Sequence, residues 1–75
     1  MIKELDVVVL QRDLPQQRLQ AGDVGTIVAV YETGQAFEVE FSTLTGRTVS
    51  VVTLQADAIR LVAPTDMTHV RAAVA

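Results

Sequence analysis

The stretch Ala-Phe-Glu-Val-Glu-Phe-Ser, residues 36–42, decides the fold, because its apolar and acidic side chains alternate with a period of two. That period is typical of a β-strand with one buried face and one solvated face. Glu38 and Glu40 are therefore expected to face the solvent. The three side chains expected to face the core are Phe37, Val39 and Phe41.

The preceding segment, Gly-Asp-Val-Gly-Thr-Ile-Val-Ala-Val-Tyr-Glu at residues 22–32, predicts a second strand that is apolar on both faces. Gly25 interrupts it, and a glycine inside a strand usually marks a bulge or a close approach of two backbones. Ile27, Ala29 and Tyr31 share one face of this strand, and valines occupy the other. A strand that is apolar on both faces is curled into a barrel, packed by another element, or part of an interface.

A further strand is predicted at residues 47–54, and glycine-containing turns separate it and the two strands above from one another. We expect Phe41 to lie opposite Arg47, which places Val49 and Val51 on the inner face. A register displaced by one residue is rejected, because a one-residue shift moves every side chain to the other face and would expose both valines.

The N-terminal part of the sequence predicts another strand and a long loop. Residues 5–10 form the strand, with Val7 and Val9 facing the core and Val8 facing outward. Residues 11–22 form a polar loop that is long for a connection between strands, and such loops often carry function. Two isolated leucines are expected to pin this loop to the sheet: Leu14 and Leu19.

The C-terminal part predicts a helical turn at residues 55–58 and a closing strand at residues 59–62. The domain is therefore expected to span residues 1–62, followed by a tail at residues 63–75. Met67, Val70 and Val74 have the i, i+3, i+7 spacing that leaves a short helix open for the tail. Five strands in this order, with a long first loop, predict an all-β protein, a small five-stranded SH3-like barrel.

Several segments in this order resemble an uncharacterised bacterial family, domain of unknown function 4926. They are Asp6-Val-Val-Val-Leu10, Leu14-Pro15, Leu19, Ala21-Gly-Asp-Val-Gly-Thr-Ile-Val28, Phe37-Glu-Val-Glu-Phe41, Gly46-Arg-Thr48 and Thr53-Leu54. The resemblance covers residues 5–61 and implies an SH3-like fold, no established activity, and a protein partner encoded nearby. A shorter resemblance, confined to the glycine-rich strand that opens at Gly22, links the chain to KOW-type SH3-like modules of ribosomal and transcription proteins.

The composition argues against several function classes. The 75 residues carry a net charge of −3, with six basic residues and no cysteine. The basic residues form no cluster of the kind that tracks nucleic-acid phosphates, so nucleic acid is not the expected partner. No thiolate metal site is possible, and no apolar stretch approaches the length of a membrane span. We expect a soluble bacterial protein of the cytoplasm.

The candidate catalytic groups do not assemble into a site, so the chain is not expected to be an enzyme. Glu38 and Glu40 are what any solvated strand face presents, and no third ligand accompanies them. His69 is the only histidine, with Asp66 three residues before it, and no nucleophile has a fixed relation to it. The glycines lack the lysine and helix of a phosphate-binding loop. We therefore expect no catalytic residue, no cofactor, no metal and no small-molecule substrate.

Excess apolar surface is the unusual feature of the sequence. One set of side chains falls on the parity opposite to the expected core: Val8, Leu10, Ile27, Ala29, Tyr31 and Val52. Patches of this kind usually mark interfaces, although the long loop and the tail could also cover them. The expected protein contact surface is Ile27, Ala29, Tyr31 and Val52, with Glu38 and Glu40 at its edge. The predicted function is a non-catalytic protein-interaction module, either self-associating or binding and neutralising a protein partner; the alternative is a nucleic-acid-associated KOW-like module.

Overall fold

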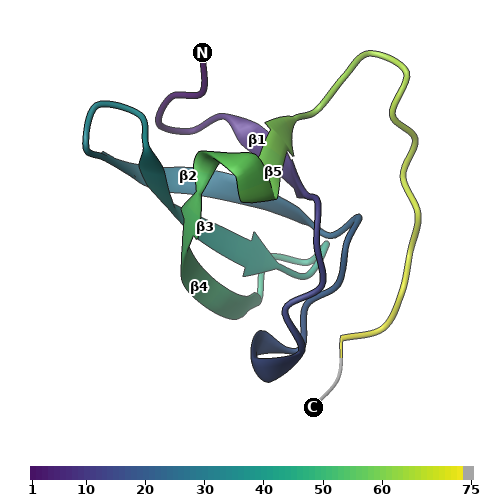
Figure 1. Ribbon diagram of the computed structural model, residues 1–75. Helices are drawn as coiled ribbons and strands as arrows, with labels where there is room; N and C mark the ends of the chain where they lie inside the picture. The colour runs from purple at the N-terminus through teal and green to yellow at the C-terminus, as the bar shows by residue number, and fades with distance from the viewer. Residues whose placement is uncertain (74–75) are drawn as a thin grey trace.

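The computed structural model describes residues 1–73, which form one antiparallel sheet of five strands in the order β4-β3-β2-β1-β5 (Figure 1). The strands are β1 (Val7–Leu10), β2 (Val24–Tyr31), β3 (Ala36–Ser42), β4 (Thr48–Gln55) and β5 (Ile59–Leu61). The described residues also form two 3₁₀ turns, η1 (Pro15–Gln17) and η2 (Ala56–Ala58), and contain no α-helix. The all-β class is confirmed. The sheet is not closed, because β4 and β5 each pair on one side only, so the word barrel describes its curvature alone.

The core lies on the inner, concave face of the sheet. β3 supplies its centre as predicted, since Phe37, Val39 and Phe41 are all buried. The remaining members of the core cluster come from the other strands, from η2 and from the loop between β1 and β2: Val8, Leu10, Leu19, Ile27, Leu54, Ala58 and Ile59. No polar or charged side chain is buried among residues 1–73.

The predicted orientation of β1 is wrong. Val8 and Leu10 face the core, with 0% and 1% of their surface exposed, whereas Val7 is 44% exposed. Val9 lies on the outer face between Val24 and Arg60, yet it is also buried. β1 consists of four apolar residues in a row, so no polar residue within it shows which side chains face the solvent. The prediction relied on the preceding residue, Asp6, which lies outside the strand and accepts hydrogen bonds from Lys3.

The predicted register of β4 is also wrong, by three residues. Phe41 lies opposite Ser50 rather than Arg47, because the hairpin loop begins one residue later than expected, with Ser42 opposite Thr48, and a bulge at Val49 shifts the pairing further. A shift by an odd number of residues exchanges the two faces of a strand. Val49 and Val51 are consequently exposed, and Leu54 enters the core in their place.

A bulge in β2 has a similar effect on its second half. The pairing with β3 is regular as far as Ile27, then skips Val28 and resumes at Ala29 opposite Glu38. Gly25 does not form a bulge. It marks the other feature that a glycine inside a strand indicates, a close approach of two backbones. A Cβ atom there would lie 2.7 Å from Val39 Cγ1.

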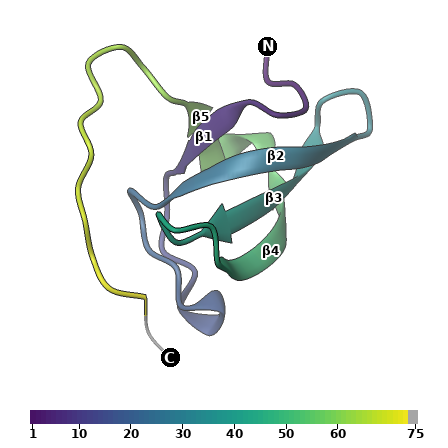
Figure 2. The same cartoon turned by 180° about the vertical axis from the view of Figure 1, so that it is seen from behind.

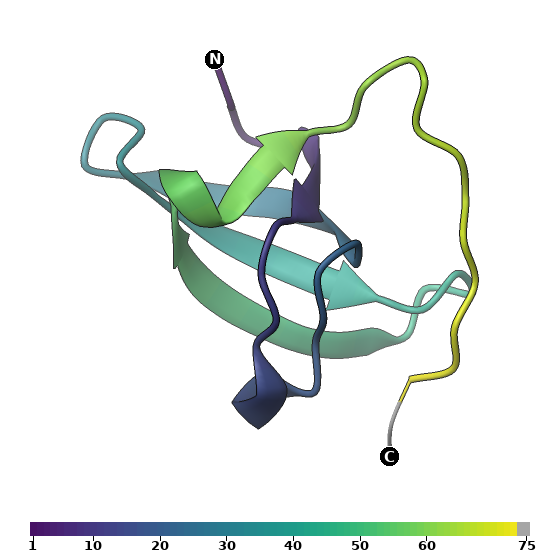
Figure 3. The ribbon, with the colours of Figure 1, turned by 45° about the vertical axis from the view of Figure 1, so that its right-hand side comes forward.

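The long loop and the tail meet at the end of the molecule that carries η1 (Figures 2 and 3). Leu19 is buried in the core and Leu14 packs against it, so these residues pin the loop as predicted. The tail beyond Leu61 contains no helix as far as residue 73, and Met67 and Val70 are exposed. These two side chains therefore do not cover the apolar surface of the sheet. Val74 lies outside the described residues.

Candidate functional site

The outer face of the sheet is the surface on which apolar and charged groups coincide. One row of cross-strand neighbours runs from Val7 on β1 through Thr26 on β2 and Glu40 on β3 to Val51 on β4. The valines at its two ends are 44% and 49% exposed. Other exposed valines from the five strands and their ends add to this apolar surface: Val24, Val49 and Val62.

Two glutamates of β3 stand in the middle of this face and are held by hydroxyl groups of β4. Thr53 Oγ1 donates to Glu38 Oε1 at 2.5 Å, and Thr48 Oγ1 donates to Glu40 Oε2 at 2.6 Å. No cation of the described chain forms a salt bridge with either carboxylate. Each carboxylate therefore keeps its negative charge available to a partner while its position is fixed by the sheet.

The structure divides the predicted contact residues into two groups. Ile27 is 0% exposed and belongs to the core, and Val52 is partly buried and packs against that core, so assigning these two to a contact surface is wrong. Ala29 remains on the outer face opposite Glu38, and Tyr31, two residues further along β2, is 44% exposed. This error has the same origin as the errors in β1 and β4, because the face assigned to the core was the opposite of the observed one.

The sequence prediction missed the outer valines of β1 and β4. Val7 and Val51 were expected inside, and no sequence signal separates them from their inward-facing neighbours, the buried Val8 and the partly buried Val52. The information that separates them is the pairing register, which depends on the bulges and on the residue at which the hairpin turn begins. The total amount of apolar surface was nevertheless foreseeable, because the strands carry valine at both parities.

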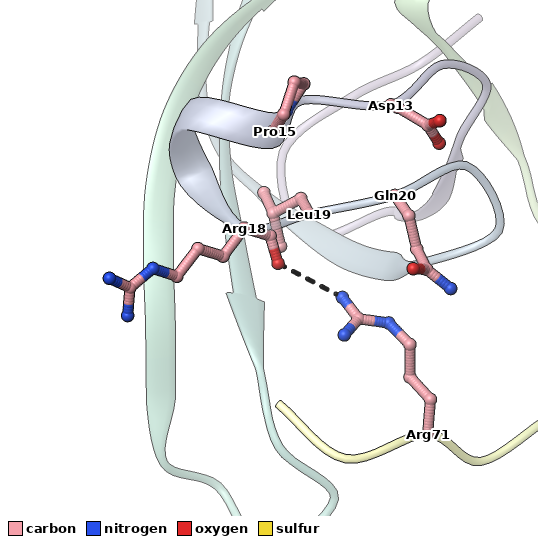
Figure 4. Close-up of a pocket in the computed structure, with 6 residues that line it drawn as sticks. All are labelled: Asp13, Pro15, Arg18, Leu19, Gln20 and Arg71. Carbon is pink, nitrogen blue, oxygen red and sulfur yellow. Dashed lines mark hydrogen bonds between the residues drawn. The ribbon is translucent and has the colours of Figure 1, made fainter. Parts of the chain in front are cut away.

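A second polar cluster joins the tail to the loop between β1 and β2. Arg71 donates two hydrogen bonds to the carboxylate of Asp23 and a third to the carbonyl oxygen of Arg18, at 3.3 Å for the last (Figure 4). Partial burial opposes ionisation of Asp23, but hydrogen bonds from Arg71 and from the N–H of Gln20 outweigh it, so the pKa of Asp23 is lowered. Arg18 and Arg71 of this cluster line an open depression together with Asp13, Pro15, Leu19 and Gln20.

The first turn of the tail is fixed by a separate ion pair. Arg60 donates to both oxygens of Asp66, at 2.8 and 3.0 Å. The hydrogen bond from Arg60, assisted by the N–H of Ala63, lowers the pKa of Asp66 to about 2. Asp66 therefore pairs with Arg60 and not with His69, which is exposed in the tail.

The described residues offer little of what catalysis or metal binding uses. Within residues 1–73, no three histidine, cysteine or carboxylate side chains gather closely enough to hold a metal ion. A further surface depression, lined by Gln35, Gln55, Ala56 and Asp57, is open and contains one charged side chain. No helix in this part of the chain has the length and apolarity to cross a bilayer.

Comparison with known proteins gives one match. The sequence model of a family described as a domain of unknown function (DUF4926) matches residues 4–61, which confirms the resemblance inferred from the motifs. The match ends where β5 ends, so the tail lies outside it. No curated protein and no solved structure matches the chain.

Proposed function

Because the chain belongs to the DUF4926 family, whose function is unknown, its activity must be inferred from its surfaces, and we propose that it is a non-catalytic module that binds another protein through the outer face of its sheet. The observation that carries the proposal is the uncovered combination of exposed valines with two fixed carboxylates on one sheet face. We also propose a cytoplasmic location, where a small domain without disulfides is common.

The chemistry of this face specifies the kind of partner. Valines at the ends of the row Val7–Thr26–Glu40–Val51 provide apolar area, which drives association in proportion to the area removed from water. Glu38 and Glu40 provide negative charge at the centre, and complementary charge fixes the register and raises the association rate. A partner with lysine or arginine among apolar side chains fits this face.

The nucleic-acid alternative has less support from the charged groups. Four of the six basic side chains form salt bridges with aspartates: Lys3, Arg12, Arg60 and Arg71. A surface that tracks phosphates needs several uncompensated cations close together. A KOW-like role would be supported by a basic stripe on one face, and the outer face is acidic instead.

A binding experiment with matched variants tests the proposal. The wild-type chain, Tyr31→Arg and Leu44→Arg are immobilised separately and exposed to a bacterial lysate; any retained protein is identified, purified and titrated by calorimetry. Tyr31 lies on β2 beside the acidic face, whereas Leu44 is an exposed apolar residue of the β3–β4 hairpin loop and serves as the control.

We expect one protein to bind the wild type and Leu44→Arg but to bind Tyr31→Arg weakly, with an affinity that falls as salt rises. Equal binding to all three chains, or retention of no protein by the wild type, would contradict the proposal.

A further inference from the structure

The free edge of β4 has a different character from the outer face. β4 lies at the opposite end of the strand order from β5, and it has eight residues. Its sequence, Thr-Val-Ser-Val-Val-Thr-Leu-Gln, contains no charged residue and no proline. Natural proteins usually protect an edge strand by charges, proline or short length, because unpaired backbone groups recruit another strand.

The opposite edge of the sheet, formed by β5, is protected from pairing with another strand. β5 has three residues, and one of them, Arg60, is charged. The Arg60 side chain also donates to the carbonyl oxygen of Leu61 at 3.1 Å, and the turn anchored by Asp66 follows directly. Among the described strands, β4 therefore offers the longer edge; it carries one bulge, at Val49, and its residues from Ser50 to Gln55 lie beyond that bulge and include no charge and no proline.

The backbone groups that β4 presents to this edge follow from one hydrogen bond. The N–H of Ala56 donates to the carbonyl of Gln35 at 3.2 Å, which sets the alternation along the β3–β4 pair. Residues 50, 52 and 54 consequently direct their N–H and C=O groups toward β3. Residues 51, 53 and 55 direct theirs to the free side, where no strand of residues 1–73 pairs with β4.

We propose that this edge pairs with β4 of a second copy of the chain, antiparallel, about a two-fold axis at Val52. In that register Val51 lies opposite the second copy's Thr53, and Ser50 lies opposite its Leu54. The outward backbone groups of each copy then meet those of the other, and the two sheets become one. No like charges face each other along the paired strands, because β4 has none.

Charge at the ends of the strand selects a second copy in this register over other occupants. Arg47 precedes β4 by one residue and Asp57 follows it by two. Antiparallel pairing about Val52 brings the β4 end that follows Arg47 in one copy beside the β4 end that precedes Asp57 in the other, and the symmetry makes this contact twice. Arg47 has no salt bridge within residues 1–73, and the Asp57 side chain is 80% exposed beside Arg12, so both are accessible.

Sedimentation equilibrium over a concentration series tests the pairing. We expect the wild type to approach the mass of two chains as concentration rises. Val51→Pro should have the mass of one chain and keep a native circular dichroism spectrum, because the N–H that it removes points to the free edge. Val51→Thr, which keeps that N–H and the β-branched shape, is the matched control and should still dimerise.

A charge exchange tests the register and does not depend on whether the proline variant folds. Arg47→Glu alone and Asp57→Lys alone should each raise the dissociation constant about tenfold, since each disturbs two symmetric ion pairs. The double variant should recover the wild-type value, because the pairs reform with exchanged signs.

A wild type that stays monomeric at every concentration, or a dimer that Val51→Pro and both charge variants leave unchanged, would overturn the pairing. These results are separable from the proposed function. A monomer that still binds another protein through the face beside Tyr31 overturns the pairing alone, whereas a dimer that binds no other protein overturns the proposed function alone.

Discussion

Replacing Gly25 by alanine tests a close approach between β2 and β3 that leaves no room for a Cβ atom. The added Cβ would lie 2.7 Å from Val39 Cγ1, and 3.0 Å from both the carbonyl oxygen of Glu40 and Cδ1 of Phe41. Carbon atoms in good contact are about 3.5–4.0 Å apart, so the nearest contact is short by about 1 Å. The carbonyl cannot retreat without breaking the pairing of Gly25 with Phe41.

The expected loss of stability combines two opposing effects. Overpacking of this kind typically costs about 1–3 kcal/mol. The lower entropy of the unfolded chain with alanine offsets about 0.4–1 kcal/mol. A net loss of about 1–2 kcal/mol should lower the melting temperature by roughly 4–16 °C for a domain of this size.

Urea unfolding followed by circular dichroism measures the change, and a double-mutant cycle with Val39→Ala identifies its cause. In the Val39→Ala background the nearest clashing atom is absent, so Gly25→Ala should cost less, by at least about 0.5 kcal/mol. A Gly25→Ala protein as stable as the wild type, or a cost that Val39→Ala does not reduce, would refute the close approach.

Three further predictions follow from the corrected faces and from the tail contacts. Val8→Ala should cost about 2 kcal/mol in urea unfolding, because Val8 is fully buried, and the adjacent Val7→Ala should cost less than about 0.5 kcal/mol; equal losses would contradict the observed parity. Arg71→Gln should release the tail from Asp23 and speed its cleavage in limited proteolysis while leaving the unfolding midpoint of the sheet nearly unchanged; an unchanged cleavage rate would contradict the anchor. The lowered pKa values of Asp23 and Asp66 mean that both contacts hold the tail at full strength above the ordinary aspartate pKa of 3.8 and weaken as pH falls, for Asp66 through about 2. Amide shifts of the tail in an NMR titration that do not move in that acidic range would count against both contacts.

The elements with a clear pattern were predictable from the sequence. β3 alternates without ambiguity, and its inner and outer residues are those expected. The turn before β5 and the anchoring of the long loop by Leu19 were also expected, because an isolated helical turn and an isolated leucine each leave few alternatives. The local sequence pattern was therefore sufficient to predict an element wherever it was compatible with one structure only.

The faces of β1 and β4 were not predictable, because their sequences support either parity. Val7 and Val8 differ in no property that a sequence rule can use, yet one is exposed and the other fully buried. The bulge that skips Val28 and the bulge beside Ser42 each add one unpaired residue, and one residue is enough to exchange the faces beyond it. The two glutamates survive as candidate contact residues, because the outer face of β3 did not depend on those choices. Ala29 and Tyr31 survive because the bulge at Val28 returns the second half of β2 to the expected face.

The presence of valine at both parities of the strands made the faces of β1 and β4 ambiguous. It is also the strongest physical argument for our proposal that the chain associates with another protein. Valine at both parities is expected where a sheet is covered on both faces, and this sheet is covered on one. A domain of about 60–75 residues buries only about 60% of the surface of its unfolded chain, so its stability is marginal without further burial. Pairing along β4 and a partner on the outer face would each remove part of the remaining valine surface from water. A sequence selected only for an isolated domain would gain solubility from polar residues at Val7, Val24 and Val51, and their retention as valine is accounted for if these positions are covered when the protein functions.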